Sequence, residues 1–100
     1  MFVLELTYTG PLEAVDAQLD AHMAWVDEHY ASGVFIASGR KNPRDGGVLL
    51  AVGDDRAHME KITAADPFVT AGLCEYRITE FIATRTVPEL AAYRQQPLSS

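Results

Sequence analysis

Residues 2–33 read FVLELTYTGPLEAVDAQLDAHMAWVDEHYASG, and the hydrophobic period changes within this stretch. From Phe2 to Tyr8 a large apolar or aromatic side chain stands at every second position, which is the period of a β-strand. Thr9-Gly10-Pro11 then breaks the pattern. From Leu12 the apolar residues follow the three-and-four spacing of an amphipathic helix, which we expect to end at Gly33. The stretch therefore predicts a strand followed directly by a long helix.

The remaining chain repeats this alternation of strand and helix. The expected elements are strands over 34–38, 48–52 and 73–83 and a second helix from Asp54 or Asp55 to about Ala65. Segment 39–47 is rich in turn residues and is expected to be a polar connection. After Pro88 the tail has the spacing of a short docking helix, and residues 97–100 are expected to fray.

The resulting order, β-α-β-β-α-β, is that of a ferredoxin-like α+β fold, in which a four-stranded antiparallel sheet carries both helices on one face. The first and last strands have apolar residues on both faces, and 48–52 is apolar throughout. An uncovered face of this kind usually marks an interface. We therefore expect a homodimer that packs sheet against sheet. In the monomeric alternative the C-terminal segment would cover the face, but about 16 residues are too few.

Length, charge and cysteine content limit the classes of function. The 100 residues fit one domain, which we divide into a core over 1–83 and a C-terminal extension over 84–100. Eight basic against 14 acidic residues give a net charge of −6, which disfavours nucleic acids and anionic membrane surfaces as partners. No apolar run is long enough to span a membrane. Cys74 is the single cysteine, which predicts a buried thiol and a cytoplasmic protein.

Three residues are candidates for a site. His22 lies on the flank of the apolar stripe of the first helix, together with Trp25, where an imidazole would act as an acid or base. Asp66 precedes Pro67, and its carboxylate is either a helix cap or part of a site. Arg40 follows the second strand and would hold a carboxylate or phenolate group, unless it is a solvated loop charge. Sequence alone favours the structural alternative for each.

No metal or cofactor is expected. His22 and His29 are seven residues apart, roughly 10.5 Å along a helix, which is too far to share one ion. The chain has no phosphate-binding loop, no dinucleotide-binding glycine motif, no serine-hydrolase elbow and no Cys-x-x-Cys pair.

The chain resembles the YciI-like (YCII-related) family. The resemblance covers residue 1 to about residue 83 and rests on His22, the segment Ala37-Ser38-Gly39 and the segment 65–69, Ala-Asp-Pro-Phe-Val. It implies a ferredoxin-like, dimeric α+β barrel related to muconolactone isomerase-like proteins. It also implies that His22 and Asp66 form a dyad in a small pocket. Two departures are Arg40, where the family often has proline, and the tail beyond residue 83.

The resemblance implies reactions on small aromatic or lactone substrates, including dehydrochlorination. Our first hypothesis is a cofactor-independent lyase or isomerase in which His22 moves a proton and Asp66 orients it. Trp25 and Phe68 would form apolar walls, with Ser38 and Arg40 as further substrate-binding residues. The alternatives are a dimeric module that binds a small ligand without turnover and a protein-interaction domain that uses its open sheet face.

Overall fold

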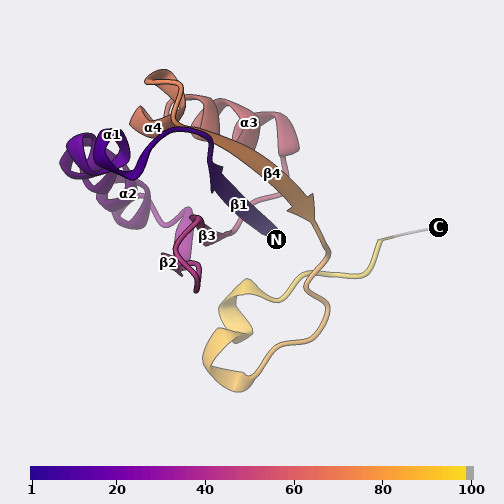
Figure 1. Ribbon diagram of the computed structural model, residues 1–100. Coiled ribbons are helices and arrows are strands. Elements are labelled where there is room, and N and C mark those ends of the chain that lie inside the picture. The colour runs from indigo at the N-terminus through magenta and orange to yellow at the C-terminus, as the bar shows by residue number, and fades with distance from the viewer. Residues whose placement is uncertain (99–100) are drawn as a thin grey trace.

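The computed structural model describes residues 1–98, in which four strands form one antiparallel sheet (Figure 1). The strands are β1 (Phe2–Tyr8), β2 (Phe35–Arg40), β3 (Gly46–Ala51) and β4 (Cys74–Glu80). Their order across the sheet is β2-β3-β1-β4. The first strand therefore lies between the third and the fourth, and the ferredoxin-like arrangement predicted from the sequence is confirmed.

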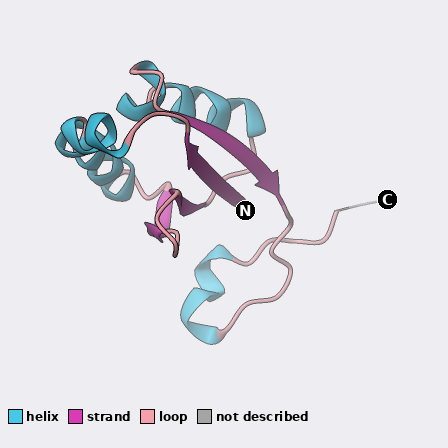
Figure 2. Cartoon of the chain, viewed as in Figure 1, coloured by secondary structure: helices cyan, strands magenta, loops and turns pink. Residues whose placement is uncertain are grey.

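The helices cover one face of this sheet (Figure 2). They are α1 (Leu12–Ala17), α2 (Leu19–Ala31), α3 (Arg56–Ala64) and α4 (Pro67–Thr70). The apolar core joins Leu4 and Leu49 of the sheet to Val26 of α2 and Met59 of α3. Burying one such side chain stabilises the fold by about 1.5–3 kcal/mol. None of the helices within residues 1–98 is long and apolar enough to cross a lipid bilayer.

The long helix expected over 12–33 is in fact two helices that meet at Gln18. Its backbone angles, φ −101° and ψ 3°, leave helical geometry, and its N–H donates to the carbonyl of Val15, three residues back. The apolar spacing continues through this break, so periodicity did not reveal it. Gly33 has a φ of 83°, a conformation that favours glycine and stops α2 from continuing.

The connection between the second and third strands is shorter than predicted. Arg40 is the last residue of β2, and Gly46 and Gly47 open β3. Lys41 donates its N–H to the carbonyl of Gly46 at 3.0 Å and so closes the turn. Glycines in a sequence indicate a turn, but their backbone groups can pair in a sheet like those of any other residue. Both strands therefore extend further into this connection than predicted.

The face of the sheet away from the helices is only partly apolar. Val3, Val48 and Leu50 form an apolar area over β1 and β3, and Val48 is 37% exposed. Strand β4 adds Glu75 and Arg77 to this face, so the expectation that the last strand is apolar on both faces is wrong.

The C-terminal extension projects from the end of β4 (Figure 1). It contains the 3₁₀-helix η1 (Pro88–Tyr93), none of whose residues is buried. The side-chain oxygen of Gln95 holds the extension, because it accepts hydrogen bonds from the Met1 amino group at 2.7 Å and from Ala83 N–H at 2.9 Å. The tail helix is therefore present but attached by polar contacts. Part of the expected frayed end, residues 99–100, lies outside the described residues.

Candidate active site

The two candidate dyad residues come from helices far apart in the sequence. His22 lies in the first turns of α2 and is 8% exposed. Asp66 is fully buried and is the N-cap residue of α4. Pro67 keeps Asp66 extended, with φ −58° and ψ 127°, and the Asp66 side chain accepts a hydrogen bond from Phe68 N–H at 2.9 Å.

The structure brings His22 and Asp66 into direct contact. Nδ1 of His22 lies 2.8 Å from Oδ1 of Asp66. Asp66 is thus both the helix cap and the partner of the imidazole, so the two roles weighed from the sequence are compatible. The sequence separation of 44 residues means that only the packing of α2 against α4 makes this pair.

A third residue completes the hydrogen bonding of Asp66. The hydroxyl of Tyr76, on β4, donates to Oδ2 of Asp66 at 2.5 Å. Burial, followed by the charge of Asp66, raises the pKa of Tyr76 above its ordinary value, so the phenol keeps its proton and acts as the donor. From the sequence, Tyr76 was only a residue of the strand expected over 73–83, with no sign of its partner.

The proton arrangement of the dyad follows from these contacts. Phe68 N–H and the Tyr76 hydroxyl are donors, and an ionised carboxylate can only accept. His22 therefore donates from Nδ1 to Asp66, and in the neutral imidazole Nε2 then carries the lone pair. Fixing one ring nitrogen in this way is how proteins set the imidazole tautomer for acid–base chemistry.

Aromatic rings pack around the imidazole of His22. The ring of Phe68 stacks on it, with centroids 4.0 Å apart and planes 7° apart. The centroid of Trp25 lies 5.6 Å away. Both rings are buried and contact His22, and neither is among the residues that line the adjoining cavity. Their position restricts the imidazole ring and keeps water from its buried side.

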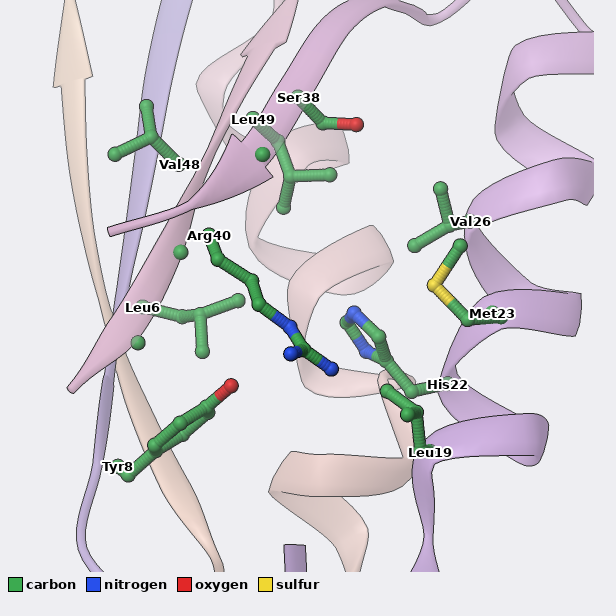
Figure 3. Close-up of a pocket in the computed structure, with 13 residues that line it drawn as sticks. Leu6, Tyr8, Leu19, His22, Met23, Val26, Ser38, Arg40, Val48 and Leu49 are labelled. Carbon is green, nitrogen blue, oxygen red and sulfur yellow. The ribbon is translucent and has the colours of Figure 1, made fainter. Parts of the chain in front are cut away.

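His22 forms part of the wall of a cavity of about 300 Å³ between α2 and the sheet (Figure 3). The apolar side chains that line it are Leu6, Leu19, Met23, Val26 and Leu49. The polar side chains are His22, Tyr8, Ser38 and Arg40. Figure 3 shows the guanidinium of Arg40 reaching toward the His22 ring. A ligand in this cavity would therefore meet a base and a cation.

A β-bulge directs Arg40 and Ser38 into the cavity. Phe35 pairs with Ala51 and Ala37 with Leu50, so Ile36 is an extra residue in β2. In a regular strand of the same sequence, Phe35 would share its face with Ala37 rather than with Ser38 and Arg40. Bulges near active sites commonly redirect side chains in this way. Arg40 is thus a strand residue that faces the helices, and among the described residues no carboxylate forms an ion pair with it.

Ser38 and Gly47 shape the cavity in different ways. The Ser38 hydroxyl lies 2.6 Å from that of Tyr30 on α2, which ties β2 to the helix. Gly47 lies opposite Leu6 and Arg40 on the helix-facing side of β3, so the cavity extends where a side chain would otherwise stand. Sequence reasoning missed Gly47, because its neighbours across the sheet come from other parts of the chain.

Cys74 lies close to the dyad but stays a thiol. Burial, followed by the charge of Asp66, raises its pKa to about 12. A thiol held in this state is a poor nucleophile, since the thiolate is the reactive form. The described residues contain no cluster of three or more His, Cys, Asp or Glu side chains arranged to bind a metal ion.

Comparisons with known proteins extend this picture. A family model described as the YCII-related domain matches residues 1–82. The fold is similar to that of 5-chloro-2-hydroxyhydroquinone dehydrochlorinase from Burkholderia phenoliruptrix AC1100, in complex with 2,5-dihydroxybenzoquinone. The TM-score is 0.68 at 18% sequence identity, over 81% of this chain and 93% of that chain. None of the curated proteins compared matches the sequence.

Proposed function

The chain belongs to the YCII-related domain family, and from this membership and the site geometry we propose that it is a small enzyme of the lyase or isomerase type. Its substrate would be a small aromatic or ring-derived acid. The observation that carries the proposal is the His22–Asp66 pair, with Nδ1 bound to a buried carboxylate and Nε2 left for a ligand in the cavity. The likeness to a dehydrochlorinase agrees with this class of reaction.

His22 would act first as a general base. Nε2 takes a proton from a carbon that neighbouring carbonyl or hydroxyl groups make acidic, and Asp66 stabilises the imidazolium. The negative charge that develops on the ligand would be balanced by Arg40. In a lyase reaction the electron pair of the broken C–H bond forms a double bond and a leaving group such as chloride departs with its own pair. In an isomerase reaction, the imidazolium returns the proton to a different carbon.

Neither reaction needs a redox partner, since every electron pair stays with the ligand or leaves with the chloride, and His22 carries the proton in both. Proton transfer by a positioned histidine contributes about 10²–10⁴ in rate, which suits a carbon acid that is already activated. The cavity is at the small end of ligand pockets, which range from about 300 to 1,000 Å³. A single substituted ring therefore fits it better than a fused or extended ligand.

A comparison of two histidine variants tests this proposal. The probes are 2,5-dihydroxybenzoquinone for binding, followed by Trp25 fluorescence, and 5-chloro-2-hydroxyhydroquinone for turnover, followed by chloride release. We expect His22→Gln to lose at least 100-fold in turnover while binding changes only a few-fold. His58→Gln, at an exposed position of α3, is the matched control and should behave like the wild type.

Two results would contradict the proposal. Turnover that survives in His22→Gln would remove the dyad from the mechanism. Tight binding by the wild type without turnover of any ring acid tested would instead identify a ligand-binding module.

We also propose that the protein is a homodimer in the cytoplasm, with the apolar area of Val3, Val48 and Leu50 at the interface. Glu5 and Arg77 lie beside this area on the same face, and Arg77 would pair with an acidic side chain of a second copy. Sedimentation analysis should give twice the chain mass for the wild type, and Val48→Lys should give monomers. A monomeric wild type at micromolar concentration would contradict this assignment.

A further inference from the structure

Among the described residues, Tyr76 is the hydrogen-bond partner of Asp66 that comes from the sheet. It lies opposite Leu6 in the β1–β4 pairing, while His22 and Phe68 belong to helices. The hydroxyl does not line the cavity next to His22, so it does not meet a ligand there. Any effect on the chemistry must therefore pass through Asp66.

The two oxygens of Asp66 have different tasks. Oδ1 accepts from Phe68 N–H and faces His22 Nδ1, whereas Oδ2 accepts from Tyr76. Rotation about the Cβ–Cγ bond moves both oxygens of the carboxylate together. The Tyr76 hydroxyl on Oδ2 opposes this rotation from the side opposite to Phe68 N–H and His22, so it helps to hold the direction from which Oδ1 meets the imidazole.

We propose that Tyr76 is a positioning residue of the His22–Asp66 dyad: its hydroxyl holds the carboxylate so that His22 keeps its proton on Nδ1 and presents Nε2 to the cavity. The ring of Tyr76 also packs near Trp25, with centroids 6.5 Å apart, and this packing is a separate, structural task. Tyr76→Phe removes the hydroxyl and keeps the ring, so it separates the two tasks. The effect of Tyr76 on the His22 tautomer can be tested whether or not the protein is an enzyme. Its effect on catalysis rests on the proposed function.

The tautomer of His22 is the first measurement. Long-range ¹H–¹⁵N NMR distinguishes a protonated from an unprotonated ring nitrogen when the imidazole is neutral. In the wild type, we expect one species with the proton on Nδ1. In Tyr76→Phe, we expect a mixture of both tautomers, because the carboxylate is no longer held at Oδ2 and turns Oδ1 away from Nδ1 in part of the molecules. The control Tyr93→Phe makes the same chemical change in η1 and should leave the spectrum unaltered.

An unchanged His22 spectrum in Tyr76→Phe would overturn the proposal. If Tyr76→Phe does not fold, the wild type provides the decisive measurement. A hydroxyl proton held between Tyr76 and Asp66 exchanges slowly with water and gives its own NMR signal. Exchange at the rate of a solvent-exposed tyrosine would show that the hydrogen bond is absent in solution.

A double-mutant cycle tests the route through Asp66. Loss of a hydrogen bond to a charged group predicts a 10- to 100-fold lower kcat/KM for Tyr76→Phe in the wild-type background, as an order of magnitude. In an Asp66→Asn background the same substitution should have an effect of less than about threefold, because the carboxylate is already gone. Equal effects in both backgrounds would mean that Tyr76 acts independently of Asp66 and would overturn the proposal. If no turnover is found, the proposed function fails, but the tautomer experiment still decides the role of Tyr76.

Discussion

Replacing Asp66 by alanine should destabilise the whole domain. Asp66 is fully buried and caps α4 through Phe68 N–H, and loss of such a cap costs about 1 kcal/mol. The Tyr76 hydroxyl and the His22 N–H would also lose their acceptor, at roughly 1–3 kcal/mol each for a buried donor. The sum is about 3–7 kcal/mol, a large part of the 5–15 kcal/mol that stabilises a typical domain.

Asp66→Asn is the matched variant for this experiment. Asparagine is as good a cap as aspartate, and its amide oxygen can still accept from Phe68 N–H. We expect it to cost about 1–2 kcal/mol, since only the charge and one acceptor oxygen are lost. The difference between the variants therefore measures the cap and the buried donors rather than the removal of a negative charge.

Urea and thermal unfolding followed by circular dichroism provide the assay. For a domain of this size, 1 kcal/mol shifts Tm by about 4–8 °C, so Asp66→Ala should melt more than about 10 °C below the wild type. Asp66→Asn should melt between the two. If Asp66→Ala costs less than about 1 kcal/mol, the hydrogen bonds to His22 and Tyr76 do not hold the fold together, and the reasoning from burial is refuted.

Three further predictions concern the cavity, the buried proton donors and the tail. Gly47→Val should weaken binding of 2,5-dihydroxybenzoquinone more than tenfold by calorimetry, because a side chain there projects toward Leu6; an unchanged affinity would mean that the ligand binds elsewhere. Stability should fall as the pH rises above about 9. Folding raises the pKa of Cys74 to about 12 and raises the pKa of Tyr76 as well. The unfolded chain loses both protons at their ordinary pKa values, so high pH favours unfolding. Below pH 9 this contribution is fully present, and a urea midpoint that stays constant from pH 8 to 11 would contradict it. Gln95→Ala should speed cleavage by trypsin after Arg85 while costing the core about 1 kcal/mol or less; equal cleavage rates would show that other contacts hold the extension.

The fold was largely predictable because its signals are local. The change from a period of two to a period of three and four after Pro11 requires only neighbouring residues, and the same holds for the cap at Asp66 before Pro67. The predictions that failed concern backbone geometry that such patterns do not record. The break at Gln18 and the strand pairing of Gly46 and Gly47 are examples.

The dyad was predicted by a resemblance, whereas its surroundings were predicted only in part. Trp25 and Phe68 were expected as walls of the pocket, and the structure places them against the imidazole of His22. Tyr76 was predicted only as a residue of the last strand. Its contact with Asp66 depends on how α4 sits on the sheet, and no spacing along the chain contains that information.

By itself, the sequence determined the order of strands and helices, the apolar faces that bury the core and the capping role of Asp66, since each depends on contacts within a few residues. Tertiary structure alone decided which side chains share the cavity. The clearest case is Arg40: regular alternation in β2 from the buried Phe35 would turn it away from the helices, and the extra residue Ile36 reverses its direction. The physical reason is that side chains alternate between the two faces of a strand. A bulge takes up one extra residue, so every later side chain lies on the face opposite to the one that regular alternation would give it.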